Sequence, residues 1–128
     1  MAVTGIHAII NTPEPDALRA VFADVFGWPS VHAHPEETEG RLANWLLFAL
    51  PPAELGVHPA DDTQHSLLFM CDDIAATIAD LRSKGIEFID EVQDMGWSLA
   101  ITMRLPGGVE VLLYEPRHVA AIDDRPSP

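Results

Sequence analysis

Two histidines, His7 and His65, stand at the same place in two similar segments of this 128-residue chain. Each is followed by a short apolar run, which predicts that each lies at the start of a β-strand. Neutral imidazole is a common ligand of divalent transition metals, and equivalent positions of a two-fold repeat face each other. The pair therefore predicts a metal site between the two halves of the chain. The alternative is two ordinary strand histidines bonded to backbone or water.

Four other side chains are of the kind that lines a pocket for an apolar ligand. Aromatic and methionine side chains offer large or adaptable contact surfaces. The four are Trp45, Trp97, Met103 and Tyr114. We predict them as substrate-binding residues, with a position in the hydrophobic core as the alternative for each.

The elements that must position these residues occur twice. Residues 7–27 read HAIINTPEPDALRAVFADVFG and align without a gap to residues 65–85, which read HSLLFMCDDIAATIADLRSKG. Residues 44–59 and 98–116 then each read as a strand, a turn and a strand. Self-similarity of this kind indicates duplication of one structural unit.

The repeat predicts two βαβββ modules, at about residues 5–59 and 64–116. One module exposes a sheet face that it cannot bury alone, whereas two modules side by side can curve their sheets toward each other. We therefore expect one α+β domain over residues 1–128, with a curved mixed sheet around a cup-shaped cavity of the size that small ligands prefer. The tail over 117–128 has alternating charge and is expected to be loosely ordered.

Each module has one helix with its own start and stop signals. The apolar positions follow the helical period and are Leu18, Val21, Phe22 and Val25 in the first helix and Ile74, Ile78 and Leu81 in the second. Asp72 or Asp73 can cap the second helix, and Gly27 and Gly85 follow the two helix ends.

The expected strands are shorter than the helices. They cover residues 5–11, 28–33, 64–71 and 86–92, and the two closing hairpins turn at residues 51–53 and 106–108. Proline in both turns cannot donate a ladder hydrogen bond, which favours turns there.

Composition limits the classes of partner. The net charge is −13, which repels nucleic acid phosphates and anionic lipids, so neither is an expected partner. The N-terminus lacks the basic start and apolar run of a signal peptide, and no stretch is long enough to span a bilayer. The single cysteine, Cys71, excludes an intramolecular disulfide. We expect a cytoplasmic protein.

The two His-led β-α units and the closing hairpins, the second reading RLPGGVEVLLYEPRH, make the sequence similar to the vicinal oxygen chelate superfamily over residues 5–116. That superfamily includes glyoxalase I, extradiol dioxygenases, fosfomycin resistance enzymes and bleomycin resistance proteins. The resemblance implies a small-molecule substrate or ligand, a divalent metal (Fe, Mn, Ni, Co or Zn) in many members, and a homodimer. One fold hosts many chemistries, so the substrate stays open.

The resemblance implies a ligand on the last strand of each module, usually a glutamate. Leu112 stands at that position in the second module and cannot bind a metal. Glu110 lies two residues earlier on the same side of the strand, so we predict it as the third ligand. In the first module the matching residues are Glu54 and His58, each either a ligand or a polar lining residue of the cavity.

Two functions follow from these residues, and a third option is a fold retained as an accessory or regulatory domain. The first is a metal-dependent isomerase, lyase or ring-cleaving oxygenase, with His7, His65 and Glu110 as ligands and Glu54 as catalytic base. The alternative is a metal-free protein that binds or sequesters a small molecule, as bleomycin resistance proteins do. Leu112 and the acidic surface favour this alternative, because an acidic surface attracts a cationic compound.

Overall fold

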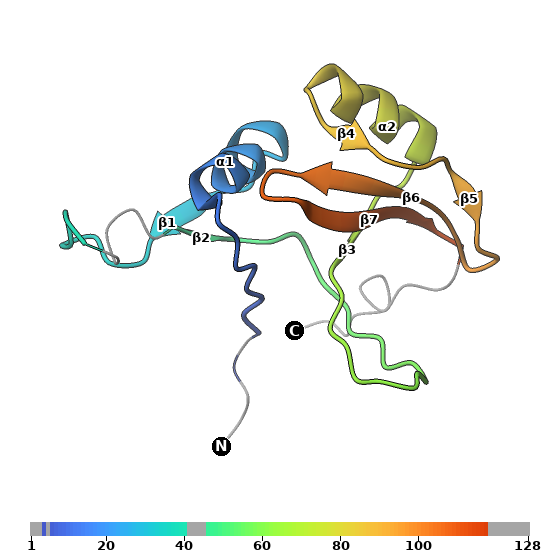
Figure 1. The fold of residues 1–128 in the computed structure, drawn as a ribbon, viewed down its shortest axis with the longest axis horizontal. Helices are drawn as coiled ribbons and strands as arrows, with labels where there is room; N and C mark the ends of the chain where they lie inside the picture. The colour runs from blue at the N-terminus through green and yellow to red at the C-terminus, as the bar shows by residue number, and fades with distance from the viewer. Residues whose placement is uncertain (1–3, 5, 41–45, 118–128) are drawn as a thin grey trace, which may run out of the picture.

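The computed structural model describes residue 4, residues 6–40 and residues 46–117. The elements in these ranges, in chain order, are α1 (Pro15–Ala20), the π-helical segment η1 (Val21–Val25), β1 (Ser30–His32), β2 (Leu46–Phe48), β3 (Leu68–Met70), α2 (Ile74–Ser83), β4 (Glu87–Phe88), β5 (Gln93–Asp94), β6 (Ser98–Leu105) and β7 (Val109–Pro116). The mixed α+β class expected from the sequence is confirmed (Figure 1).

The main sheet has the strand order β3-β7-β6-β4, with β5 paired to β6 beside β4. Strands β6 and β7 form an antiparallel hairpin over their full length, while β3 runs parallel to β7, so the sheet is mixed and curved (Figure 1). The predicted turn at residues 106–108 is confirmed. Gly107 and Gly108 there have φ of 84° and 71°, which favour glycine.

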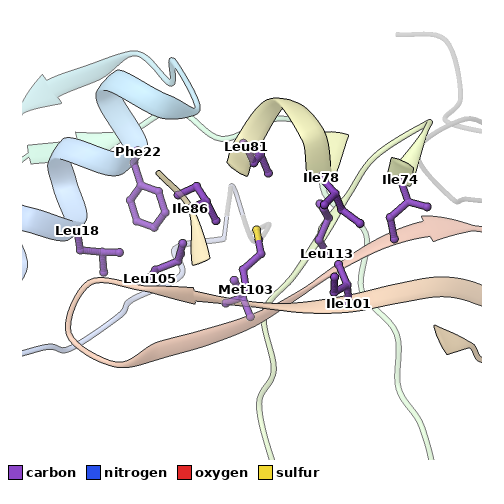
Figure 2. Packing of buried hydrophobic residues seen from close by; sticks show 11 residues of the cluster. Leu18, Phe22, Ile74, Ile78, Leu81, Ile86, Ile101, Met103, Leu105 and Leu113 are labelled. Atoms are coloured by element: carbon purple, nitrogen blue, oxygen red, sulfur yellow. The ribbon is translucent and has the colours of Figure 1, made fainter. Parts of the chain in front are cut away.

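The two faces of the main sheet differ because side chains alternate along each strand. Ile101, Met103 and Leu113 face α2 and form the hydrophobic core with Ile78 and Leu81 of that helix (Figure 2). We call the opposite face, turned away from α2, the distal face. It carries Leu68, Met70, Ala100, Leu112 and Tyr114, because the register pairs Leu68 with Leu112, and pairs Tyr114 with both Met70 and Ala100.

Helix α2 forms as the sequence predicts. The side chain of Asp73 accepts a hydrogen bond from the backbone N–H of Ala76 (3.0 Å), and Oε1 of Glu115 accepts one from the N–H of Ile74 (3.1 Å). The two carboxylates thus satisfy donors that a helix start leaves unpaired. Gly85 follows the helix with φ of 89°.

The first predicted helix forms as α1 followed by η1. Its buried residue Phe22 stacks on Trp28, with ring centroids 5.1 Å apart, and also contacts Phe48 and Phe69. Since Phe69 belongs to β3, this aromatic cluster joins the first helix to the main sheet.

Several strands of the first half differ from the prediction. The described part of 5–11, residues 6–11, has no regular secondary structure, and the hairpin expected over 44–59 keeps β2 alone among its described residues. Strand β2 pairs with β1 in a separate two-stranded sheet. Pro51, Pro52 and Pro59 supply no N–H donor to a ladder, which disfavours a strand over 54–58.

In the remaining predicted strands only two or three residues pair. The strand expected over 64–71 is confined to β3, that over 28–33 to β1, and that over 86–92 to β4. Trp45, part of the tail and part of the predicted loop before Trp45 lie outside the described residues.

Candidate functional site

Tyr114 is the centre of a small cluster on the distal face. It is buried, and its ring lies against the ring of Trp97, with centroids 5.4 Å apart and planes inclined by 63°. Trp97 immediately precedes β6 and keeps 43% of its surface exposed. The β6–β7 register positions both residues at the end of the hairpin opposite its turn. The two predicted lining residues are therefore brought together.

Glu54, the predicted catalytic base, reaches this cluster from the long segment between β2 and β3. The phenol of Tyr114 donates a hydrogen bond to the carboxylate of Glu54. Burial raises the pKa of Tyr114 above its usual 10.0, and the negative charge of Glu54 and this hydrogen bond raise it further. The phenol therefore stays protonated near neutral pH, so it can hold the Glu54 side chain in place.

Ser98 adds a polar group that sequence reasoning missed. It is 0% exposed, and its Oγ has no hydrogen-bond partner within the described part of the chain. Ser98 lies on the same face as Ala100, the strand partner of Tyr114. The period-two pattern of β6 was the signal that could have assigned it to this face.

An apolar surface continues from the cluster across β7 to β3. Leu112 and Met70 are partly buried there, and Leu68 is 38% exposed. Among the described strands β3 pairs with β7 alone, so this surface ends at an edge of the main sheet as described. We call Leu68, Met70 and Leu112 the apolar bed. It lies next to two aromatic rings, the hydroxyl that one of them carries, and a carboxylate. Such a combination suits an organic molecule with one polar end.

The predicted metal ligands do not meet at one site. Glu110 does lie toward the distal face, but its Oε1 is 3.1 Å from Nη2 of Arg104, which also pairs with Glu87 at 3.5 Å. His7 and His65 are both exposed and lie outside the strands. Among the described residues, no three His, Cys, Asp or Glu side chains come together as metal donors. As they are placed here, these described side chains do not form a metal centre.

Two other predicted residues lie away from the cluster. His58 is exposed, and its ring folds back onto Gly56, where an added Cβ would lie 2.9 Å from Nε2. Met103 is fully buried in the core on the face toward α2, opposite Tyr114 (Figure 2). The structure therefore gives Met103 the core position that was its alternative.

Two shallow cavities lie elsewhere in the first half of the chain. One, of about 300 Å³, is lined by residues 33–37, and the other, of about 240 Å³, is lined by residues 29–31 and 47–49. Neither is lined by a predicted site residue. No helix in the described part of the chain is long and apolar enough to cross a membrane.

Comparison with known sequences gives two matches. The sequence model of the Glyoxalase/Bleomycin resistance protein/Dioxygenase superfamily matches residues 6–119. The uncharacterized protein YetH of Bacillus subtilis (strain 168) is 30% identical over 84 residues, which cover 59% of this chain and 70% of YetH.

Comparison with solved structures gives the same fold. TnmS3, an antibiotic binding protein from Streptomyces sp. CB03234, superposes with a TM-score of 0.62 at 18% identity, over 91% of this chain and 98% of TnmS3. A lactoylglutathione lyase from Agrobacterium tumefaciens superposes with a TM-score of 0.50 at 23% identity, over 81% of this chain and 87% of the lyase. At these identities the likeness concerns the fold alone.

Proposed function

Because the chain belongs to the Glyoxalase/Bleomycin resistance protein/Dioxygenase superfamily, we propose that it is a metal-free protein that binds a small organic molecule on the distal face. The observation that carries the proposal is the contact of Glu54 and Trp97 with Tyr114 beside an apolar bed. In this proposal the two modules form one domain, and the protein acts in the cytoplasm without nucleic acid or membrane partners.

The chemistry of the cluster supports binding more directly than catalysis. Trp97 and Leu68 present apolar surface to a ligand, while Glu54 and Tyr114 fix the position of a polar end. The Glu110 carboxylate, which a metal centre would need as a ligand, is already paired with Arg104. TnmS3, which shares the fold, is described as an antibiotic binding protein, and this makes a binding role a natural use of such a sheet.

The proposal is tested with N-phenylnaphthylamine, a neutral aromatic probe whose fluorescence rises in apolar sites. We expect the purified protein to bind it, and Trp97→Ala to raise the dissociation constant by about fivefold. The matched control is Val31→Ala, which removes an exposed apolar side chain from the separate sheet and should leave the constant unchanged. No binding, or equal effects of the two substitutions, would contradict the proposal.

A metal-dependent enzyme of the glyoxalase or dioxygenase type is the second candidate. Its support is the pair of equivalently placed histidines, His7 and His65, together with the fold shared with a lactoylglutathione lyase. In this candidate Glu110 completes the ligand set and Glu54 acts as base. Elemental analysis of the native protein tests it: about one equivalent of Fe, Mn, Ni, Co or Zn that His7→Ala and His65→Ala release would favour the enzyme.

A further inference from the structure

We propose that the distal face selects organic cations, namely molecules that carry an ammonium group on an apolar body. The cation would lie against the exposed ring of Trp97, in the corner that it forms with the buried ring of Tyr114, next to the carboxylate of Glu54. This inference rests on the proposed binding function and names the ligand class of the same site.

The aromatic pair supplies the first part of the argument. The planes of the Trp97 and Tyr114 rings are inclined by 63°, so the rings form two walls of a corner rather than a stack. A cation within about 6 Å of an aromatic centroid is attracted by the negative face of the ring, most strongly for tryptophan. With 43% of its surface exposed, Trp97 is accessible to such a group.

The carboxylate of Glu54 supplies the second part. It is half-buried, so its charge is less screened by solvent than that of a surface carboxylate. A carboxylate offers about four acceptor positions, so it can accept from a ligand ammonium in addition to its present partners, the Tyr114 phenol among them. Two aromatic rings and one carboxylate are the groups that recognise organic ammonium ions.

Among the residues that the structure describes, the charges around the corner are compatible with a cation. Arg117 lies at this end of the sheet, where its backbone N–H donates to the carbonyl oxygen of Trp97 (2.9 Å). Its guanidinium is paired with Asp94 at 3.1 Å, so its positive charge is compensated locally. The net charge of −13 also raises the concentration of cations near the surface, an effect that salt weakens.

The apolar bed next to Tyr114 offers a surface for the rest of the ligand. Leu68, Met70 and Leu112 extend from Tyr114 toward the sheet edge, so an ammonium in the corner would place an attached hydrocarbon body on them. A small inorganic cation would leave this bed exposed. The ligand class is therefore an amphipathic organic cation.

The test uses two compounds of the same shape that differ in charge, meta-hydroxyphenyl trimethylammonium and meta-tert-butylphenol. Each displaces N-phenylnaphthylamine, and circular dichroism verifies that every variant is folded. We expect the cation to bind about tenfold more tightly than the neutral compound to the unsubstituted protein. In Glu54→Gln this preference should fall to about twofold or less, with the affinity of the neutral compound retained.

Glu87→Gln is the control, because it removes the same charge from an exposed carboxylate of β4. It should keep the preference for the cation. Equal affinities in the unsubstituted protein, or a preference that survives in Glu54→Gln, would overturn the inference while leaving the binding function intact. If neither compound nor the probe binds, the proposed function itself fails and the inference with it.

Discussion

Tyr114 links the residues of the proposed site. It is the only tyrosine of the chain, it is buried, and its hydroxyl and ring contact two residues from different segments, Glu54 and Trp97. A substitution at Glu54 therefore changes the environment of a single, spectroscopically distinct phenol. The contact on which the proposed site depends can be observed without knowing the ligand.

The alkaline titration of Tyr114, followed by tyrosinate absorbance, should have its midpoint above 10.0, because burial and Glu54 both disfavour the phenolate. In Glu54→Gln the midpoint should fall, since the charge repulsion is removed while the burial remains. A midpoint at or below 10.0, or an unchanged midpoint in Glu54→Gln, would show that the two side chains are not in contact.

The same shift predicts how stability depends on pH. The pKa of Tyr114 is higher in the folded state than in the unfolded chain, so its contribution to stability is fully present below pH 10.0. The contribution is lost as the pH rises through the folded-state pKa. Burial also raises the pKa of Cys71 above 9.0, which acts in the same direction, so the difference between the protein and Glu54→Gln isolates Tyr114.

At the scale of elements, the β6–β7 hairpin holds the two halves of the chain together through its turn as well as its core. Gly107 lies in that turn with φ of 84°, and a Cβ atom on it would overlap Oγ1 of Thr12, just before α1. The first half of the chain thus approaches the turn closely. Glycine is required there for conformation and for space.

Gly107→Ala should therefore destabilise the protein by about 1–3 kcal/mol more than Gly108→Ala. Gly108 has a similar positive φ of 71°, but no atom lies within 4 Å of an added Cβ, so it measures backbone strain alone. Urea unfolding of the two variants gives the comparison. Equal free energies of unfolding would mean that Thr12 moves away at no cost.

Sequence reasoning predicted the elements whose signals are local. The cap at Asp73, the glycine after α2 and the turn at residues 106–108 specify α2 and the hairpin without reference to the rest of the chain. The segments 6–11 and 54–58 carry apolar residues too, but a strand needs a neighbouring edge, and no local signal says whether one is available.

The candidate site was predictable only in part. Tyr114 and Trp97 were identified by residue type, and Glu54 by the alignment of the two modules. Their contact was not predicted, because the segment that carries Glu54 has no periodicity that fixes its path. Met103 was predicted as a lining residue although its register partner is Val111, on the face toward α2. Side chains alternate between the two faces along β6, so counting residues back from the turn would have placed Met103 in the core.

At the scale of the whole molecule, the exposed apolar residues favour contact with a second protein surface. Ile6, Ile9, Leu55 and Val57 are between 71% and 90% exposed and lie in the segments without regular structure. Large apolar side chains exposed to this degree are costly in water, and patches of them are typical of interaction surfaces. The homodimer implied by the family resemblance would cover these residues.

We therefore expect light scattering to give a mass twice the 14.0 kDa of one chain. The double substitution Leu55→Asp, Val57→Asp should shift the protein toward the monomer, because it places charges in the expected interface. Val92→Asp, at a less exposed position between β4 and β5, serves as the control. A monomeric native protein would contradict the expected dimer.

The central claim is that the distal face binds a small molecule without a metal, and probe binding to metal-stripped protein tests it most directly. The protein is treated with EDTA, dialysed, verified as metal-free by elemental analysis and titrated with N-phenylnaphthylamine. We predict a dissociation constant within about twofold of that before stripping. Loss of binding on stripping, restored by Mn, Fe, Co, Ni or Zn, would contradict it.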